Sequence, residues 1–342
     1  MDPSQRHSGP AVLSQNRYRC LGWRGKILLC NEYLARNSPN MMEIVLLTFF
    51  LLLQRGIRLL ILLYRNLGKG GTQAIIESLP GDAVRVTLKM ARPWNFKPGQ
   101  YMFITIPSVG LWTSHPFSLA WSDEEERLDS EKGLAMNRQD ILALNKTSMS
   151  AIVRKRDGFT RGLFKKAESS EGRVVLHAIV EGPYGALQDM RSYGTVLLFA
   201  GGVGITHQVP YVRDLVTGYA NGTVAARRVT LIWIIQSPEH LEWIRPWMTS
   251  ILALDKRRDI LRIQLFVTRP RSTKEIHSPS ATVQMFPGRP NIDTVVEMES
   301  ESQVGAMGVS VCGPGGLADE VRKAVRTRQN RNIDFIEESF SW

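Results

Sequence analysis

One stretch of the chain, residues 41–66, is far more apolar than any other. Residues 44–53 are apolar apart from one threonine, and a second apolar run, 57–63, follows a short polar break. Neither run reaches the ~20 residues that a helix needs to cross a bilayer, but together they do. We therefore predict a helix over 41–66 that spans a membrane, with Arg55 and Arg58 reaching the interface or facing protein. An interfacial amphipathic helix or a partner-binding helix is the alternative.

The flanks of this apolar stretch are polar. Residues 1–40 are mixed and lack the basic start, apolar middle and small-residue cleavage site of a secretory signal. Basic residues occur on both sides of the stretch, so charge does not orient it. The glycines in 68–71 indicate a hinge, after which the hydrophobic pattern changes.

From residue 70 to about residue 190 the pattern alternates in short runs separated by Gly and Pro, which is typical of strands. We expect strands over 74–79, 83–90, 100–106, 115–121, 149–155 and 174–180, and a short helix over 160–167. Residues 122–147 are acidic at their start and lack periodicity, so we expect a surface insertion there. Short strands at this spacing favour an antiparallel barrel over 70–190.

Residues 191–342 alternate between buried-strand runs and helical patterns. We expect strands over 195–200, 229–236, 261–267, 308–312 and 333–335. One helix is expected from the glycine-rich turn after the first of these strands to about Val216. Further helices are expected over 240–254, 292–298 and 317–327, with a loop over 270–283. This alternation predicts a doubly wound parallel sheet.

Composition agrees with two folded domains. The chain has 342 residues, of which 43% are hydrophobic and 22% charged, enough for real cores and for about two domains. Three cysteines exclude a disulfide framework and indicate a reducing compartment, at least for the C-terminal part of the chain. The net charge of +11 is scattered along the chain, so we expect no nucleic-acid partner and interpret it as a basic segment beside a membrane.

Two glycine-rich turns each follow a predicted strand and open a predicted helix. The first glycine turn covers residues 201–206 and the second covers residues 312–316. Glycines there let a backbone approach a pyrophosphate, which the amides of a helix N-terminus would bind. Tight packing turns are the alternative, because the spacing is not that of the three-glycine dinucleotide fingerprint. Cys312 is as readily a small core residue as a functional one.

Two further groups of residues could bind a ligand in the predicted barrel. His115, Pro116, Phe117 and Ser118 combine aromatic and hydroxyl groups at a strand end, which suits a flat heterocycle. Arg154 precedes residues 158–160 at a predicted helix start, where charge and amides could hold a phosphate. A core or surface histidine and a solvated basic turn are the alternatives.

In chain order the motifs are KPGQY, HPFS, GFT, GPYG, GGVGIT, GRP and CGPGG, followed by an aromatic ending. Over about 70–342 their combination resembles the flavoprotein half of the ferric reductase/NADPH oxidase family, built on the ferredoxin–NADP reductase fold. The ending looks closest to fungal-type ferric-chelate reductases. The resemblance implies an antiparallel β-barrel FAD domain, a doubly wound parallel-sheet NADP domain and one N-terminal apolar helix.

The resemblance also implies roles for individual residues. The flavin ring would lie against His115, Pro116, Phe117 and Ser118, and the FAD pyrophosphate near Arg154, Gly158 and Thr160. NADPH would be held by Gly201, Gly202, Gly204, Ile205, Thr206, Arg289, Cys312, Gly313 and Gly315, with Arg289 at its 2′-phosphate. Ser118 and Cys312 would lie where hydride is transferred, and Phe340 or Trp342 would shield the flavin. No metal-ligating residues are expected.

Two departures from the family pattern change these expectations. Gln236 stands where the family often has an arginine for the 2′-phosphate, which weakens the preference for NADPH over NADH. None of the six histidines lies in the apolar stretch, so this chain alone cannot bind the family's two haems through paired histidines. The resemblance therefore implies a chain truncated before the haem-binding membrane helices, and a haem-bearing membrane partner.

The resemblance implies an FAD-dependent oxidoreductase that takes hydride from NADPH and passes single electrons to a ferric chelate or a haem. Its expected location is a membrane, the plasma membrane first, with both nucleotide-binding domains in the cytosol. A superoxide-producing oxidase and a non-catalytic, membrane-tethered nucleotide-binding subunit are the alternatives. We also predict that Gly204→Val blocks NADPH while sparing FAD, because its side chain would occupy the path of the pyrophosphate.

Overall fold

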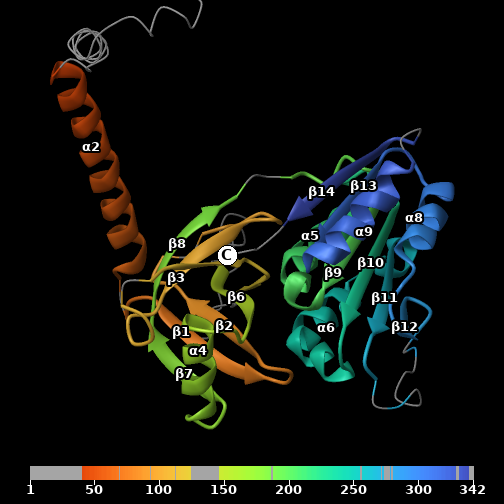
Figure 1. Ribbon diagram of the computed structural model, residues 1–342, viewed down its shortest axis with the longest axis horizontal. Helices are drawn as coiled ribbons and strands as arrows, with labels where there is room; N and C mark the ends of the chain where they lie inside the picture. Colours follow the sequence, from red (N-terminus) through yellow and green to blue (C-terminus); the bar gives the residue numbers. More distant parts are fainter. Residues whose placement is uncertain are drawn as a thin grey trace, which may run out of the picture. The chain divides into compact units, whose positions relative to one another are not determined.

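The structure, a computed structural model, describes residues 41–68, 70–92, 94–111, 113–124, 146–185, 188–254, 256–270, 272, 278, 280–328 and 331–338 (Figure 1). The chain divides into two units, Met1–Leu60 and Ile61–Trp342.

Helix α2, Met41–Asn66, coincides with the apolar stretch. Its many leucines favour helix, and Thr48 donates its hydroxyl hydrogen to the Ile44 carbonyl within the helix at 2.7 Å. Within it, the 23-residue segment Ile44–Asn66 contains an 18-residue stretch with a mean hydropathy of 2.0, so it is long and apolar enough to cross a bilayer. The helix is therefore confirmed, and the membrane remains a prediction from length and composition.

The predicted barrel consists of two antiparallel sheets in the described part of the chain. The first sheet has the order β5-β6-β2-β1-β7 and the second the order β4-β3-β8. Helix α4, Phe159–Glu168, packs Phe159, Leu163 and Ala167 into their common core. The strands are β1 Gln73–Leu79, β2 Ala83–Lys89, β3 Tyr101–Thr105, β4 His115–Ser118, β5 Trp121–Glu124, β6 Lys146–Arg154, β7 Arg173–His177 and β8 Ile179–Tyr184.

The strand predicted over 115–121 is in fact two strands in different sheets. Ser118 ends β4 opposite Tyr101 of β3, and the Leu119 amide then donates to the Gln100 carbonyl. The next amide, that of Ala120, donates to Ser150 of β6 in the other sheet. The prediction of one strand was wrong because hydrophobic alternation continues through this change of partner. A similar break at Ala178 divides the strand predicted over 174–180 into β7 and β8.

The second half of the chain forms a parallel sheet with the order β12-β11-β10-β9-β13-β14 among the described residues. Its strands are β9 Thr195–Gly201, β10 Arg228–Ile235, β11 Leu261–Val267, β12 Val283–Pro287, β13 Met307–Cys312 and β14 Ile333–Glu338. Strand β12 was not predicted. It is short and half exposed, so it lacks the solid apolar run of its neighbours.

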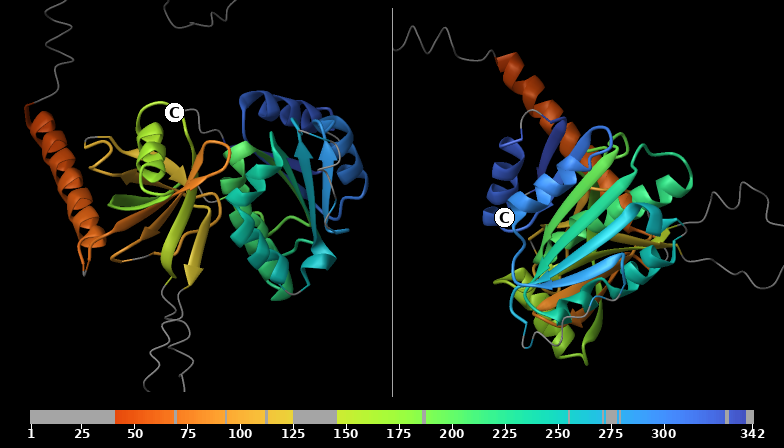
Figure 2. Two further views of the ribbon diagram at one scale, coloured as in Figure 1. Left: turned by 90° about the horizontal axis from the view of Figure 1, so that it is seen from below. Right: turned by 90° about the vertical axis from the view of Figure 1, so that its right-hand side faces the viewer.

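Helices cover both faces of this sheet (Figure 2). Side chains of α5 and α6 share one core with the sheet, and those of α8 and α9 share another on the opposite face. The helical elements are η2 Gly202–Gly204, α5 Ile205–Ala220, η3 Pro238–Trp243, α6 Arg245–Ala253, α7 Arg257–Ile260, α8 Ile292–Glu301 and α9 Gly315–Arg326. The helix predicted over 240–254 is thus divided into η3 and α6.

Tryptophans join the barrel to the parallel-sheet half. The Trp243 indole donates to the Pro80 carbonyl at 2.6 Å, and Trp121 stacks on Trp247 with ring centroids 5.9 Å apart. Arg213 lies over the Trp121 ring at 4.3 Å and donates to the Ser122 carbonyl at 2.9 Å. These contacts place the two halves at a defined interface.

Candidate functional site

The two glycine turns meet at the carboxyl ends of adjacent strands β9 and β13. A Cβ on Gly313 would lie 3.0 Å from the Gly201 Cα, and one on Gly201 would lie 2.6 Å from Pro314 Cδ. A Cβ on Gly204 would overlap the Cys312 carbonyl. The two turns therefore converge, and the close approach of the two backbones requires glycine at 201, 204 and 313.

Gly202, Gly315 and Gly316 differ from those packing glycines. A Cβ on any of the three would meet no atom within 4 Å. Gly202 has a φ of +55°, and its carbonyl accepts a hydrogen bond from the Trp233 indole at 2.9 Å. Gly315 and Gly316 begin α9 without a side-chain cap, so its first amides are open. This open cradle fits the pyrophosphate of a nucleotide.

The other residues of the first glycine turn have structural partners. Ile205 is fully buried, and the Thr206 hydroxyl donates to the Val203 carbonyl at 2.8 Å. Sequence reasoning missed Gln208, whose buried amide donates to the Phe199 carbonyl and the Ser310 hydroxyl, each at 3.1 Å. Gln208 thereby ties β9, β13 and α5 together beneath the turns. Only its polarity within an apolar helix face could have drawn attention to it.

Cys312 lies at the tip of β13, buried, with Glu338 of β14 opposite it in register. Burial, followed by the nearby Glu338 carboxylate, raises the pKa of the Cys312 thiol to about 12. Burial also raises the pKa of Glu338. The thiol is therefore neutral at physiological pH. Sequence reasoning missed Glu338, because its place beside Cys312 follows only from the pairing of β13 with β14.

The predicted flavin-binding residues lie on β4. His115 stacks on Phe159 of α4 with ring centroids 4.4 Å apart, and Phe117 lies 6.3 Å from the same ring. The His115 Nε2 atom is buried without a hydrogen-bond partner among the described residues, and burial lowers the pKa of this histidine. Ser118, 8% exposed, ends the strand. An orphaned ring nitrogen beside aromatic rings fits a heterocyclic ligand that supplies a hydrogen bond.

The start of α4 is also open. Gly158 precedes the helix with a φ of +69° and no side-chain cap, and a Cβ there would meet nothing within 4 Å. Thr160 accepts a hydrogen bond from the Arg156 amide at 2.8 Å, which fixes the turn. Lys155 pairs with Asp82 at 3.0 Å, whereas the exposed side chain of Arg154 has no hydrogen bond or ion pair with any other described residue. The amides of α4 and Arg154 together suit a phosphate.

Tyr211 of α5 connects the barrel to the nucleotide end of the parallel sheet. A Cβ on Gly99 would overlap the Tyr211 hydroxyl, and a Cβ on Gly185 would lie 3.3 Å from the Gly99 carbonyl. Burial, followed by Glu338, raises the pKa of Tyr211 to about 12. Tyr211 therefore packs against the barrel turn that precedes β3 and is influenced by the same Glu338 that lies opposite Cys312.

Three residues at the carboxyl ends of β10, β11 and β12 bear on the 2′-phosphate prediction. Arg289 and Gln236 are both exposed. The structure adds exposed Arg269, whose amide donates to the Gln236 carbonyl at 3.0 Å. Sequence reasoning missed Arg269, which becomes a neighbour of Gln236 only through strand pairing. Phe340 and Trp342 lie outside the described residues.

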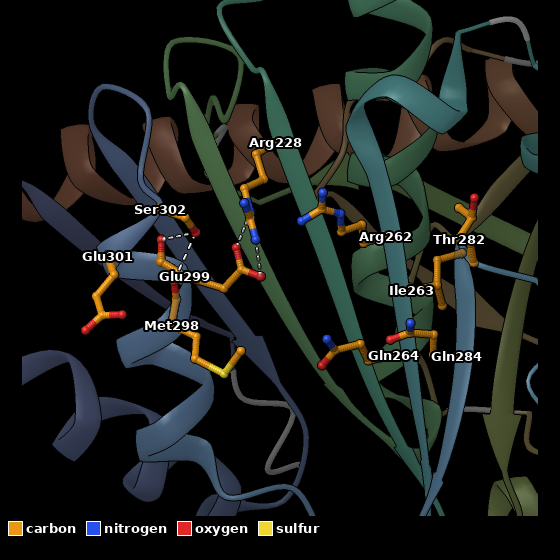
Figure 3. Close-up of a pocket in the computed structure, with 11 residues that line it drawn as sticks. Arg228, Arg262, Ile263, Gln264, Thr282, Gln284, Met298, Glu299, Glu301 and Ser302 are labelled. Carbon is orange, nitrogen blue, oxygen red and sulfur yellow. Dashed lines mark hydrogen bonds and ion pairs between the residues drawn. The ribbon is translucent and has the colours of Figure 1, made fainter.

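A pocket of about 540 Å³ lies at the opposite, amino-terminal ends of the strands (Figure 3). Arg228 and Glu299 form a mostly buried ion pair in it at 2.6 Å, and the Thr230 hydroxyl donates to the same carboxylate at 3.1 Å. This pocket is separate from the two glycine turns, because the strands of a parallel sheet run in one direction between its two ends.

Comparisons with known proteins agree with this geometry. Residues 193–326 match the family model of the ferric reductase NAD-binding domain, and residues 69–131 match that of an FAD-binding domain. A ferredoxin NADP⁺ reductase from Neisseria gonorrhoeae, solved with FAD and NADP bound, superposes with a TM-score of 0.51 at 13% identity. That alignment covers 78% of this chain and 97% of the reductase, and it supports the fold.

Curated relatives include a probable cell surface ferric reductase of Aspergillus oryzae, 30% identical over 51% of this chain. A ferric/cupric reductase transmembrane component of Saccharomyces cerevisiae is 24% identical over 80% of it. The chain spans 22% and 39% of the lengths of these two relatives. With both domain matches and these relatives, the chain is similar to the ferric reductase/NADPH oxidase family in the region that carries the FAD-binding and NAD-binding domains.

Proposed function

We propose that this chain is an FAD-dependent oxidoreductase that takes hydride from NADPH and delivers single electrons to a ferric chelate or a haem. The observation that carries the proposal is the meeting of the two glycine turns at the start of α5, the helix whose Tyr211 contacts the barrel turn at Gly99. A flavin held there accepts an electron pair and releases it one electron at a time, as one-electron acceptors require.

The contribution of the protein to this chemistry is placement. Gly202, Gly315 and Gly316 leave room for the nucleotide pyrophosphate, and the amides that open α9 bind it. His115, Phe117 and Ser118 hold the flavin ring, with Arg154, Gly158 and Thr160 at the FAD phosphates. Close stacking of the two rings then sets the rate. No general base is needed, and the neutral Cys312 thiol acts by position.

The proposed organisation is an FAD domain over 70–190 and an NADP domain over 191–342, both cytosolic, after a helix anchored in the plasma membrane. Residues 125–145 of the predicted insertion lie outside the described residues, while its flanks belong to β5 and β6. Arg289, joined by Arg269, would bind the 2′-phosphate, with NADH as a weaker donor. Phe340 or Trp342 would shield the flavin. Any haem would come from a membrane partner.

The test is to purify the full chain in detergent, supply FAD, and measure NADPH oxidation with ferricyanide as acceptor. We expect retained flavin and NADPH-dependent turnover, together with loss of turnover in a Gly315→Val variant that keeps its flavin. An absence of both flavin and turnover in the folded wild-type chain would contradict the proposal.

The chain is also similar to a superoxide-generating NADPH oxidase heavy chain subunit of Dictyostelium discoideum, so a superoxide-producing reaction is the second candidate. In membranes, dye reduction that superoxide dismutase abolishes would support the superoxide-producing reaction. Reduction of a ferric chelate that superoxide dismutase leaves unchanged would support electron delivery to a ferric chelate. Because no histidine lies within α2, a non-catalytic tethered subunit is the third candidate. It predicts flavin binding without reduction of any acceptor.

A further inference from the structure

A second pocket, outside the nucleotide and flavin sites, lies where the chain leaves α2. Its volume is about 480 Å³, and we call it the linker pocket. It is lined by Gly68, Gly70, Gly71, Gln73, Lys89, Met90, Ala91 and Arg92. Two of these residues are basic and none is acidic, so the pocket favours an anion.

The glycines of the linker pocket are held in a fixed turn. The Gly71 amide donates to the Gly68 carbonyl at 3.1 Å, and a Cβ on Gly68 would lie 3.0 Å from Ala91 Cβ. Gly70 and Gly71 have φ values of +86° and +65°, and a Cβ on either would meet nothing within 4 Å. Gly70 and Gly71 therefore present open backbone beside Lys89 and Arg92.

Strand pairing holds the basic residues over this turn. Gln73, which starts β1, lies opposite Lys89, which ends β2. Three residues later, Arg92 lies over the Tyr64 ring at 3.9 Å and donates through Nη1 to the Tyr64 carbonyl. Only Nη1 of its guanidinium is used in that bond, so other N–H groups remain for an anion.

The end of α2 is fixed to the same region. The Asn66 side chain donates to the Val180 carbonyl at 2.8 Å and accepts from the Val180 amide at 2.9 Å. Arg65 donates to the Gly182 carbonyl and lies 4.9 Å from the centre of the Trp94 ring. The linker pocket is thus held rigidly beside the last turn of the helix.

This position implies the depth of the pocket in a membrane. The 23-residue segment Ile44–Asn66 is long enough to cross the hydrocarbon layer, so Gly68, two residues later, would emerge among the lipid headgroups. Tyr64 is 65% exposed and Leu67 61% exposed, and an exposed tyrosine is typical of this interface.

We propose that the linker pocket binds the phosphate of an anionic phospholipid through Lys89, Arg92 and the backbone of the glycine turn. A free phosphate has the same chemistry, but the pocket lies at headgroup depth and opens beside exposed Tyr64 and Leu67, so a lipid supplies the ligand. This binding is independent of electron transfer, since none of the lining residues belongs to the flavin or nucleotide sites.

The test uses the full chain in a neutral detergent, titrated with dioctanoyl phosphatidic acid, dioctanoyl phosphatidylcholine or inorganic phosphate, with binding followed by calorimetry. We expect tight binding of phosphatidic acid alone. Lys89→Gln with Arg92→Gln should weaken it ~30-fold, since each basic residue near an anionic lipid contributes ~1 kcal/mol. Equal binding of inorganic phosphate would overturn the lipid assignment.

The matched control is Lys256→Gln with Arg258→Gln, which removes the same charge from an exposed site on the parallel-sheet half. This control should leave the affinity for phosphatidic acid unchanged. An equal loss of affinity would show that binding depends only on net charge, which would overturn the assignment of the linker pocket as the site. Gln73→Glu keeps both cations and adds a negative charge to the pocket, so it should also weaken binding. Unchanged affinity in folded Gln73→Glu and Lys89/Arg92 variants would reject the proposal.

Discussion

The Tyr211 hydroxyl on α5 lies so close to Gly99 of the barrel that a single added carbon on Gly99 would overlap it. Gly99 directly precedes the residues that lead into β3, the partner of the flavin-binding strand β4. Tyr211 belongs to the helix that the first glycine turn opens. This contact therefore helps to set the spacing between the two proposed cofactor sites, together with the tryptophan contacts between the two halves.

The first prediction concerns this contact. Gly99→Ala should lower the free energy of unfolding and slow NADPH-dependent reduction of ferricyanide, because the methyl group pushes α5 away from the barrel. Gly222→Ala is the control, since Gly222 has a similar positive φ of +70° but open space around it. The control should show only the ~1 kcal/mol of backbone strain. Urea unfolding and steady-state kinetics of both variants provide the measurement, and equal rates in the two would contradict the prediction.

The structure changes the expected outcome for Gly204→Val. The added side chain would collide with the Cys312 carbonyl instead of entering the pyrophosphate path, so we expect the variant to lose stability. Gly315→Val is the better probe of nucleotide binding, because its Cβ meets open space and its φ is not in the left-handed region. It should keep the melting temperature and flavin content of the wild type while raising the KM for NADPH. Thermal melting and kinetics distinguish the two variants.

The Cys312 thiol should not titrate in the ordinary range. Burial first, and then Glu338, raises its pKa to about 12, so NADPH oxidation should show no step near pH ~8.5, where an exposed thiol titrates. Iodoacetamide should label Cys312 slowly for the same reason. Peptide mapping after timed labelling measures this, and rapid modification of Cys312 at neutral pH in the folded protein would count against it.

His207 should make the fold sensitive to acid. Burial lowers its pKa from 6.5 to about 4, so the unfolded state binds the proton more readily than the folded state. Its contribution to stability is complete above pH 6.5 and is lost as the pH falls towards 4, by ~3 kcal/mol for a shift of this size. Chemical unfolding at several pH values in this window should show a flatter dependence for His207→Gln than for the wild type. The same pH dependence of the unfolding free energy in both proteins would contradict the role given to His207.

Arg289 and Arg269 should determine the preference for NADPH. Replacing either with Gln should lower kcat/KM for NADPH by roughly 10- to 100-fold, as expected for a charge-assisted bond of ~1.5–3 kcal/mol, and leave NADH unaffected. Gln236→Arg should raise the preference. Arg258→Gln, also exposed but outside the site, serves as the control. A parallel loss with both nucleotides would show a general role instead.

Much of the fold could be predicted from hydrophobic periodicity. Strand β11 was predicted with its observed bounds, and α2, α4 and β9 differ by at most one residue at each end, because each has a solid or strictly periodic apolar pattern. Strand β12 was missed because it is half exposed, and the break at Leu119 was missed because a change of partner sheet leaves the hydrophobic pattern unchanged.

The sequence predicted only those parts of the candidate site that consist of residues close together along the chain. Glycine turns that follow strands are visible in the sequence, and their convergence follows from the adjacency of parallel strands. Glu338, Arg269 and Tyr211 could not be predicted, because each acquires its neighbour through strand register or through the contact between the two halves. Such pairings depend on the assembled structure.

The parallel stacking of Trp121 on Trp247 makes the boundary between the two halves optically visible. Their rings are 5.9 Å apart and inclined by only 9°, and indoles in such an arrangement couple electronically. One ring is on a strand of the barrel and the other on a helix of the parallel-sheet half, so the coupling exists only while the two are in contact. Near-ultraviolet circular dichroism can therefore report directly whether the halves separate during turnover.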